Sequence, residues 1–323
     1  MRKFAGLVTF LLFIVLTIEI LIFSPKETGL SPPPRPTSEF EVGENEQWIQ
    51  GADLIETREG KKEWELRAER ANSTKEKGLW ILETVRSKFY SENDDGVFFV
   101  VKGDRGRVVV ATKDMEVSGN VDVQSSNGYT FNTEKINYSS SDRLLTSDDP
   151  VKMQGLADAD SDGIYLEGVG LLASLKEQYM DVTSSVKLVR RLKDGRVVTV
   201  RSEKARFFSY NRSAIFEGKV IVDIGAARIT GPVAKFEYDS NTKALSSMEV
   251  EGGVNLSDTD KWATARKVKM SFVSDEFILT GSPKMVQNNE ELVGEVIRFS
   301  EGGRKVEVSN GKASFESGFA ELK

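Results

Sequence analysis

MEVSGNVDVQSSNGYTFNTEKINYSSSDRLLTSDDPVKM, residues 115–153, carries the pattern that decides the fold. Apolar side chains recur two or four residues apart, as in Val117, Val121 and Val123, and Gly119-Asn120 interrupts this first run. Polar turn sequences such as Ser125-Ser126-Asn127-Gly128 follow about every eight to twelve residues. Because successive side chains point to opposite faces of a strand, this spacing predicts short antiparallel strands with one buried face.

The same pattern recurs along most of the chain, with a period of about 28 to 36 residues. Its copies begin near Ala71, Arg107, Lys135, Val169, Ala205, Ala234, Ala265 and Val296. Each copy reads as two short strands joined by a polar turn. One hairpin cannot bury its own apolar face, so stacked copies must share an interior.

We therefore predict an all-β fold, in which repeated antiparallel hairpins form an open jelly-roll-like (β-taco) sandwich of two facing sheets. A closed barrel is disfavoured because the repeat has no evident closing element. A parallel β-helix is the alternative fold, although its turns of about 20 to 25 residues fit the two-strand repeat less well.

The N-terminal 45 residues precede this pattern. Phe4–Phe23 is apolar apart from two Thr and one Glu, and as a helix it would span roughly 30 Å, the thickness of a bilayer core. We predict an uncleaved transmembrane anchor over residues 1–24, with the cytoplasmic end marked by Arg2 and Lys3. A cleaved signal peptide is the alternative, and no small-residue cleavage site supports it. Residues 25–45, rich in proline, are predicted to be an extended linker.

Composition excludes several classes of function. The chain has 44 basic and 50 acidic residues, a net charge of -6, and no basic block, so we expect no nucleic-acid partner. It contains no Cys and no His, which removes disulfides, thiolate zinc sites, cysteine nucleophiles and the commonest general base. We predict that the protein is not an enzyme, with no catalytic residue, no metal and no cofactor.

Three acidic segments were candidates for chemistry. Asp158, Asp160, Asp162 and Gly163 match the start of a calcium loop, but its twelfth position is Val169 instead of Glu, so a solvated acidic turn is favoured and calcium binding stays open.

Asp148-Asp149-Pro150 and Asn93-Asp94-Asp95-Gly96 are paired carboxylates of the kind glycosidases use. Both sit in turn-forming sequence, so we predict turns.

Two further segments are ambiguous. Gly168 and Gly170 follow a predicted strand with no helix after them, so they indicate a bulge or a close backbone approach instead of a phosphate-binding loop. Leu171–Met180 has some helical propensity, but it lies within the β repeat, and a strand is therefore predicted there.

Three segments occur in the order GADLIETREGKKEWELRAERA (51–71), VSGNVDVQSSNGYTFNTEKINYSSSDRLLTSDDPVKMQG (117–155) and GIYLEGVGL (163–171). In this order they resemble the LptC family of lipopolysaccharide export. From about Arg191 the chain instead resembles LptA and the OstA-type domain, in phrases such as ITGPVAKFEY and LTGSPKMVQNN. The predicted domains are therefore an LptC-like β domain at 46–190 and an LptA/OstA-like β repeat domain at 191–323. LptC-like proteins normally end after one such domain, so the chain resembles an LptC fused to an LptA-like segment.

The resemblance implies a single-pass inner-membrane protein with a cytoplasmic N-terminus and most of its chain in the periplasm. It further implies that lipopolysaccharide is accepted from an inner-membrane ABC transporter and passed along a β bridge toward the outer membrane. The implied partners are lipopolysaccharide, the transporter subunits, and an LptA-like bridge protein or further copies of the chain joined by edge-strand addition.

An apolar groove inside the folded sheets could shield acyl chains from water while sugars project outward. The strand residues predicted to line this groove are Val117, Val121, Val123, Phe131, Ile136, Tyr138, Val151, Met153, Phe207, Ile215, Val220, Phe236, Val254, Met270, Ile278, Met285 and Phe299.

The same residues could instead be the packed core of a closed sandwich. Two other functions stay open. A tethered periplasmic scaffold or assembly adaptor that binds only proteins would have a dry, packed interior and no bound lipid. A polysaccharide-processing enzyme is the least favoured, because it needs carboxylates clustered in a cleft.

Overall fold

The computed structural model describes residues 46–74, 78–91, 96–155, 157, 161–208, 212–239, 241–242, 244–288, 290–300 and 304–314. The predicted membrane anchor and linker lie outside these residues. All the strands of the described residues lie in one compact unit, Glu44–Lys323. Among the residues described, no helix has the length and apolar character needed to cross a membrane.

In the described residues of the Glu44–Lys323 unit there are twenty-one strands, and they belong to one sheet. Their bounds are β1 (Glu46–Arg58), β2 (Lys61–Thr74), β3 (Leu79–Tyr90), β4 (Phe98–Val109), β5 (Met115–Ser125), β6 (Thr130–Ser139), β7 (Leu144–Gln154), β8 (Ser161–Ser174), β9 (Tyr179–Leu192), β10 (Val197–Ser202), β11 (Lys204–Phe208), β12 (Ser213–Ile224), β13 (Ala227–Tyr238), β14 (Leu245–Ser257), β15 (Lys261–Ser271), β16 (Glu276–Thr280), β17 (Lys284–Gln287), β18 (Glu290–Val293), β19 (Val296–Ser300), β20 (Lys305–Ser309) and β21 (Lys312–Ser314).

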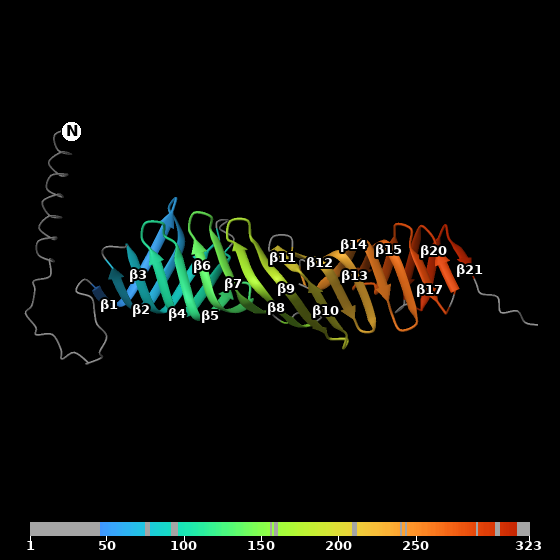
Figure 1. The fold of residues 1–323 in the computed structure, drawn as a ribbon, viewed down its shortest axis with the longest axis horizontal. Helices are drawn as coiled ribbons and strands as arrows, with labels where there is room; N and C mark the ends of the chain where they lie inside the picture. Colours follow the sequence, from blue (N-terminus) through green and yellow to red (C-terminus); the bar gives the residue numbers. More distant parts are fainter. Residues whose placement is uncertain are drawn as a thin grey trace, which may run out of the picture. The chain divides into compact units, whose positions relative to one another are not determined.

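Most strands pair antiparallel with the strands next to them in the chain, so β1 to β21 follow one another along the unit (Figure 1). Where strands are short, two of them lie end to end in the place of one long strand. For example, β10 and β11 both lie between β9 and β12 and pair with both of them. The all-β antiparallel fold predicted from residues 115–153 is confirmed, and the parallel β-helix is wrong. The strands form one continuous sheet, whereas two facing sheets were predicted.

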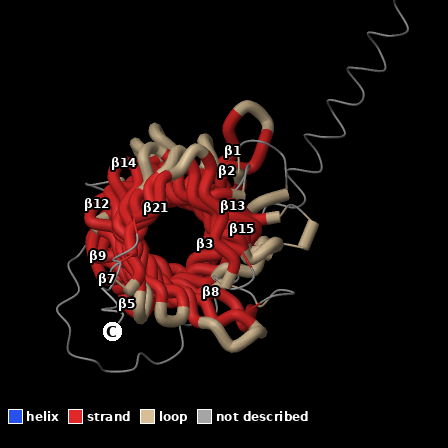
Figure 2. Tube along the Cα trace, turned by 90° about the vertical axis from the view of Figure 1, so that its right-hand side faces the viewer, coloured by secondary structure: helices blue, strands red, loops and turns tan. Residues whose placement is uncertain are grey.

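A bend near the middle of many strands folds this sheet over on itself. Register shifts occur at Gly119-Asn120 in β5, where they affect its pairing with both β4 and β6, and between Glu251 and Val254 in β14. Each is a bulge, which adds a residue to one strand and increases its local twist. As a result the strands wrap around a common axis (Figure 2).

The bulge at Gly119-Asn120 shows why the sequence breaks its alternation there. Both residues have positive φ, 80° and 47°, a conformation that glycine adopts without strain and asparagine tolerates. A Cβ on Gly119 would lie 2.8 Å from the Asp104 carboxylate of the adjacent strand. The interruption predicted at this point is a bulge inside β5 and not its end.

Other local predictions have mixed outcomes. The bulge predicted at Gly168–Gly170 is confirmed, because the β8–β9 register shifts between Glu167 and Val169 and a Cβ on Gly168 would collide with the Val182 side chain. No helix forms over Leu171–Met180, and the strand predicted there is confirmed at both ends of the segment, where β8 ends at Ser174 and β9 begins at Tyr179; a turn, which was not predicted, separates them.

The turn predicted at Asp148-Asp149-Pro150 is also wrong, since these residues lie within β7. The β7–β8 register shifts between Ser147 and Pro150, so Asp148-Asp149 form a bulge that Pro150 directly follows, a place where a missing backbone N–H is tolerated. Turn-forming residues therefore mark a bend inside a strand here. The other paired carboxylate, Asn93–Asp95, lies outside the described residues.

Candidate functional site: the interior of the folded sheet

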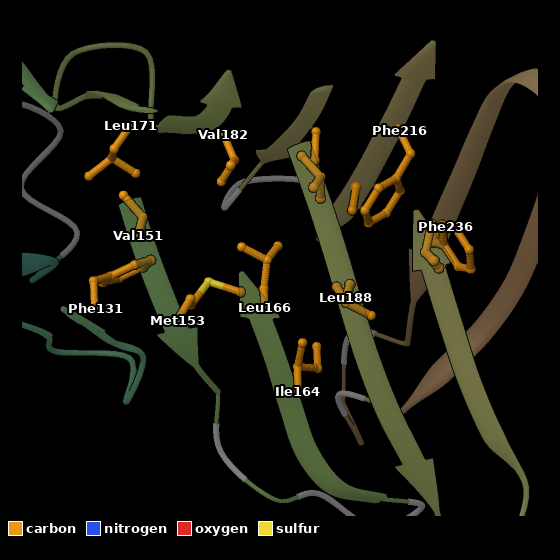
Figure 3. Close-up of a cluster of buried hydrophobic side chains, with 14 of the residues drawn as sticks. Phe131, Val151, Met153, Ile164, Leu166, Leu171, Val182, Leu188, Phe216 and Phe236 are labelled. Atoms are coloured by element: carbon orange, nitrogen blue, oxygen red, sulfur yellow. The ribbon is translucent and has the colours of Figure 1, made fainter. Parts of the chain in front are cut away.

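The inward faces of the strands form one apolar cluster that runs from Ala52 in β1 to Phe299 in β19. Alternate residues of each strand belong to it, as in β5, where Val117, Val121 and Val123 are buried. Figure 3 shows side chains from β6, β7, β8 and β9 pointing into the same space as Phe216 and Phe236 from β12 and β13. Because period-two side chains share a face, a bent sheet collects all of them inside.

Most of the predicted groove residues lie on this inward face. They are Val117, Val121, Val123, Phe131, Ile136, Tyr138, Val151, Met153, Val220, Phe236, Val254, Met270, Met285 and Phe299, all buried, together with the half-buried Phe207, which packs against the cluster. The structure brings them together over many strands. Whether lipid contacts them stays a prediction.

Ile215 and Ile278 were assigned to the wrong face. Ile215 pairs with Arg206 of β11 and with Lys235 of β13. Because directly paired residues point to the same face of a sheet, Ile215 lies on the outer surface with those charged side chains. The inward position beside it belongs to Phe216, which is fully buried. Phe216 continues the even-numbered alternation of Val220 and Val222, a signal that the sequence already contained.

Ile278 also lies on the outer face. It pairs with Lys269 of β15 and Arg298 of β19, while its neighbour Leu279 is fully buried in the interior. Large apolar residues on both faces of a strand make the choice of face ambiguous, and the paired strands resolve it.

Around Phe216 the interior is closely packed. Phe216 meets Phe236 edge to face with ring centroids 5.3 Å apart, and Phe207 meets Phe216 at 5.9 Å. A void of only about 10 Å³ lies among Leu188, Val200, Phe216 and Phe236, room for about one water molecule at most. An acyl chain could enter here only if side chains or strands moved apart.

The two long edges of the folded sheet face each other, and we call the line between them the mouth. In an antiparallel meander every second turn lies on the same edge. The β1–β2, β3–β4 and β9–β10 turns therefore belong to the first edge, and the β6–β7, β8–β9 and β15–β16 turns to the second. No strand pairing among the described residues joins one edge to the other, so side chains make the contacts between them.

At the β1 end the mouth is closed by a buried polar network. Glu63, at the start of β2, is 2% exposed and accepts hydrogen bonds from the hydroxyls of Tyr138 (2.6 Å) and Ser140 (3.0 Å) in the opposite edge. Arg58 pairs with Glu63 at 3.1 Å and donates to the Ser140 carbonyl at 2.9 Å. Burial and the bond to Glu63 raise the pKa of Tyr138 above its usual range.

Further contacts continue this closure along the unit. Arg143 of the β6–β7 turn donates to the Tyr90 carbonyl of the first edge (2.8 Å), and Gln178 of the β8–β9 turn donates to the Ser91 hydroxyl (3.1 Å). Farther along, Arg196 of the β9–β10 turn binds Asp275 of the β15–β16 turn at 2.8 Å.

Comparison with known proteins identifies the family. A family model described as "Lipopolysaccharide-assembly, LptC-related" matches residues 10–191, more than half of the chain. The chain belongs to the LptC-related family. A second model, described as "LptA/(LptD N-terminal domain) LPS transport protein", matches residues 199–302. The LptC resemblance and the LptA-like segment predicted from the sequence are confirmed, and both matching families are transport and assembly families, not enzyme families.

Among solved structures, the LptC-related chain is similar to LptH from Pseudomonas aeruginosa, the LptA-homologous periplasmic component of a lipopolysaccharide transport device. The identity is 14%, the TM-score is 0.34, and the match covers 37% of this chain and 95% of that one. A comparison with curated protein sequences finds no significant match.

One charged residue of the LptC-related chain lies inside the apolar interior, and the sequence prediction missed it. Arg190 is 2% exposed, on the inward face of β9 between Leu188 and Leu192, and its guanidinium lies 5.6 Å from the Tyr238 ring. In VKLVRRL, the alternation that starts at Val186 reaches Arg190 and not Arg191, so the signal was present.

The acidic segment predicted as a solvated turn, with calcium binding left open, cannot be placed, because Asp158 and Asp160 lie outside the described residues. In the part of the chain that the structure describes, no three acidic, His or Cys side chains are grouped so that they could hold a metal ion.

Proposed function

We propose that this LptC-related chain is a membrane-anchored periplasmic component of lipopolysaccharide export. It accepts the glycolipid from an inner-membrane ABC transporter and passes it along a β bridge toward the outer membrane. Residues 1–24 anchor it as a single-pass inner-membrane protein, and residues 46–323 are periplasmic. Its interior acts as an open jelly-roll-like trough for acyl chains. The resemblance of residues 1–24 to a transmembrane segment and the two family matches support this assignment.

One observation carries the proposal: a single apolar cluster continues through both matched segments, from Ala52 to Phe299. Such a continuous inward face would shield acyl chains along the whole unit. Because the interior is packed in this structure, the trough opens only when lipid arrives, and the mouth contacts separate to admit it.

We further propose that the ends of the sheet dock its neighbours. Within the described strands, β1 pairs only with β2, and β20 and β21 pair only with β19 and β18. The inward-facing Ile49 of β1 is 42% exposed. Strand addition to these edges would extend the apolar interior into a transporter subunit at one end and an LptA-like bridge protein or a second copy of the chain at the other.

Photo-crosslinking tests the trough. A crosslinking amino acid at Phe131, in the interior, should form an adduct with lipopolysaccharide during active export. The matched control is Ile278, an apolar residue of the outer face, which should form none. Adducts at neither position during active export would count decisively against a lipid conduit.

The packed interior also favours a second candidate, a tethered scaffold that binds only proteins. Mass spectrometry of the purified chain separates the two. The conduit should retain bound glycolipid when it is purified gently from exporting cells, whereas the scaffold should carry none.

A further inference from the structure

A surface hollow interrupts the mouth where the two family segments meet. It has a volume of about 680 Å³ and lies between the β9–β10 turn of the first edge and the β13–β14 and β15–β16 turns of the second. Residues Leu192–Arg196 of its wall fall in the interval between the two matched ranges, which end at 191 and begin at 199. The volume is within the range of about 300–1,000 Å³ typical of ligand sites.

The floor of this hollow is the outer boundary of the apolar interior. Leu192 and Leu245 line the hollow and are also members of the interior cluster, and Phe272 lines it and packs against that cluster. Leu245 borders the small interior void as well. The hollow and the interior are thus separated by a single layer of apolar side chains.

The rim combines an exposed apolar side chain with charges of both signs. Val273 is 85% exposed, the highest exposure among the large apolar residues described. Lys193 and Arg196 lie beside Asp194 and Asp239. Because the positive charges are balanced by carboxylates, the hollow does not favour a phosphate or another anion; its apolar floor favours a hydrocarbon chain.

A single ion pair bridges the mouth at this point. Arg196 binds Asp275 of the opposite edge at 2.8 Å and Asp194 of its own turn at 2.7 Å. All three side chains are partly exposed, and exposed ion pairs are weak and screened by salt. The closure here is therefore far easier to open than the buried Glu63 network.

We infer that the hollow is a side portal into the interior, which takes an acyl chain of the glycolipid where the LptC-related and LptA-like segments meet. Arg196 and Asp275 form the clasp of this portal. The inference rests on the proposed function, and it adds a route by which a lipid joins or leaves the trough from the side, between its two ends.

The test uses the full chain in detergent with purified lipopolysaccharide as the probe. A photo-crosslinking amino acid is placed at Val273, whose exposure makes the substitution structurally mild, at Phe131 in the interior, and at Ile278 on the outer face. Adducts are expected at Val273 and Phe131 but not at Ile278, and mass spectrometry should map the Val273 adduct to the acyl chains.

The other outcomes separate the two proposals. An adduct at Phe131 without one at Val273 overturns the portal and leaves the conduit standing. No adduct at either position overturns the portal, and crosslinking at Phe131 during active export then decides whether the conduit stands. Adducts at all three positions, or a Val273 adduct on the sugar, overturn the portal because the contact would be nonspecific or would involve the wrong part of the lipid.

The clasp has its own test. Asp275→Ala should increase the rate of adduct formation at Val273 by about two- to fivefold, the effect of losing one partly exposed ion pair. Because the chain contains no Cys, Arg196→Cys with Asp275→Cys can be joined by a short bismaleimide. The joined chain should lose the Val273 adduct, while each single variant should keep it. A joined chain that still forms the adduct would show that this pair does not control the hollow.

Discussion

Two regions of the mouth are held shut in different ways. Near β1, Glu63 is buried beneath the opposite edge with Tyr138 and Ser140 as hydrogen-bond partners. Near β15, the partly exposed Arg196 and Asp275 span a hollow of about 680 Å³. A buried carboxylate that loses its partners cannot regain water, whereas exposed partners can. The first region is therefore built for closure, and the second for opening.

The largest effect should come from Glu63→Ala, which leaves Tyr138 and Ser140 without their acceptor. We expect a loss of about 2–4 kcal/mol of unfolding free energy, or roughly 5–15 °C in the melting temperature. Thermal unfolding measured by circular dichroism would show it. The matched control is Asp53→Ala, which removes an exposed carboxylate paired with Arg67 and should change the melting temperature little. If both variants lowered the melting temperature equally, the buried Glu63 network would be no more stabilising than the exposed Asp53–Arg67 pair.

Tyr138→Phe is a milder change at the same place, since it removes one hydrogen bond and keeps the ring that packs on Phe89 at 4.7 Å. A loss of about 1–2 kcal/mol is expected. Combined with Glu63→Ala, the two losses should not add, because both variants break the same bond. A double-mutant cycle with urea denaturation measures this coupling, and full additivity would contradict the network.

Alkaline pH should weaken the Glu63–Tyr138 network. The folded-state pKa of Tyr138 lies above its unfolded value of 10.0, so the stabilisation is complete below about pH 10 and is lost as the pH rises toward the folded-state value. Tyr90, whose pKa burial raises to about 12, adds to this trend. Stability measured from pH 9 to 12 should fall less steeply in Tyr138→Phe than in the parent chain. If stability fell equally steeply with pH in the two proteins, the pKa of the Tyr138 hydroxyl would be the same in the folded and unfolded states.

The smallest effect on stability belongs to Arg196→Ala, because its carboxylate partners remain solvated. We expect a change of at most about 1 kcal/mol, falling toward zero in high salt. Chemical denaturation at low and high salt would measure this, with Glu63→Ala as the salt-insensitive comparison. A loss as large as that of Glu63→Ala would contradict the contrast between the two regions.

Local features of the fold could be predicted because they depend on neighbouring residues. Alternation in residues 115–153 placed β5, β6 and β7, and isolated glycines at Gly168 and Gly170 marked a bulge. Errors arose where that local signal was ambiguous. Ile215 and Ile278 lie in strands that are apolar on both faces, and Asp148-Asp149-Pro150 uses turn residues at a bend inside a strand.

The candidate site could be predicted only in part. The alternation of apolar residues along the strands predicted most of the inward-facing side chains. Phe216, Leu279 and Arg190 were missed, although they fit the same alternation. The mouth contacts and the hollow could not be predicted from the local sequence pattern, because each is formed by turns that lie on opposite edges of the sheet.

By itself, the sequence determined the strand alternation, the family and the apolar face that becomes the interior, because each depends on short-range pattern. Only the tertiary structure decided which turns meet: Tyr138 reaches Glu63 across 75 positions, and Arg196 reaches Asp275 across 79. The physical reason is that small bends and twists accumulate over many strands before the two edges of the sheet come together, and no single strand encodes that sum.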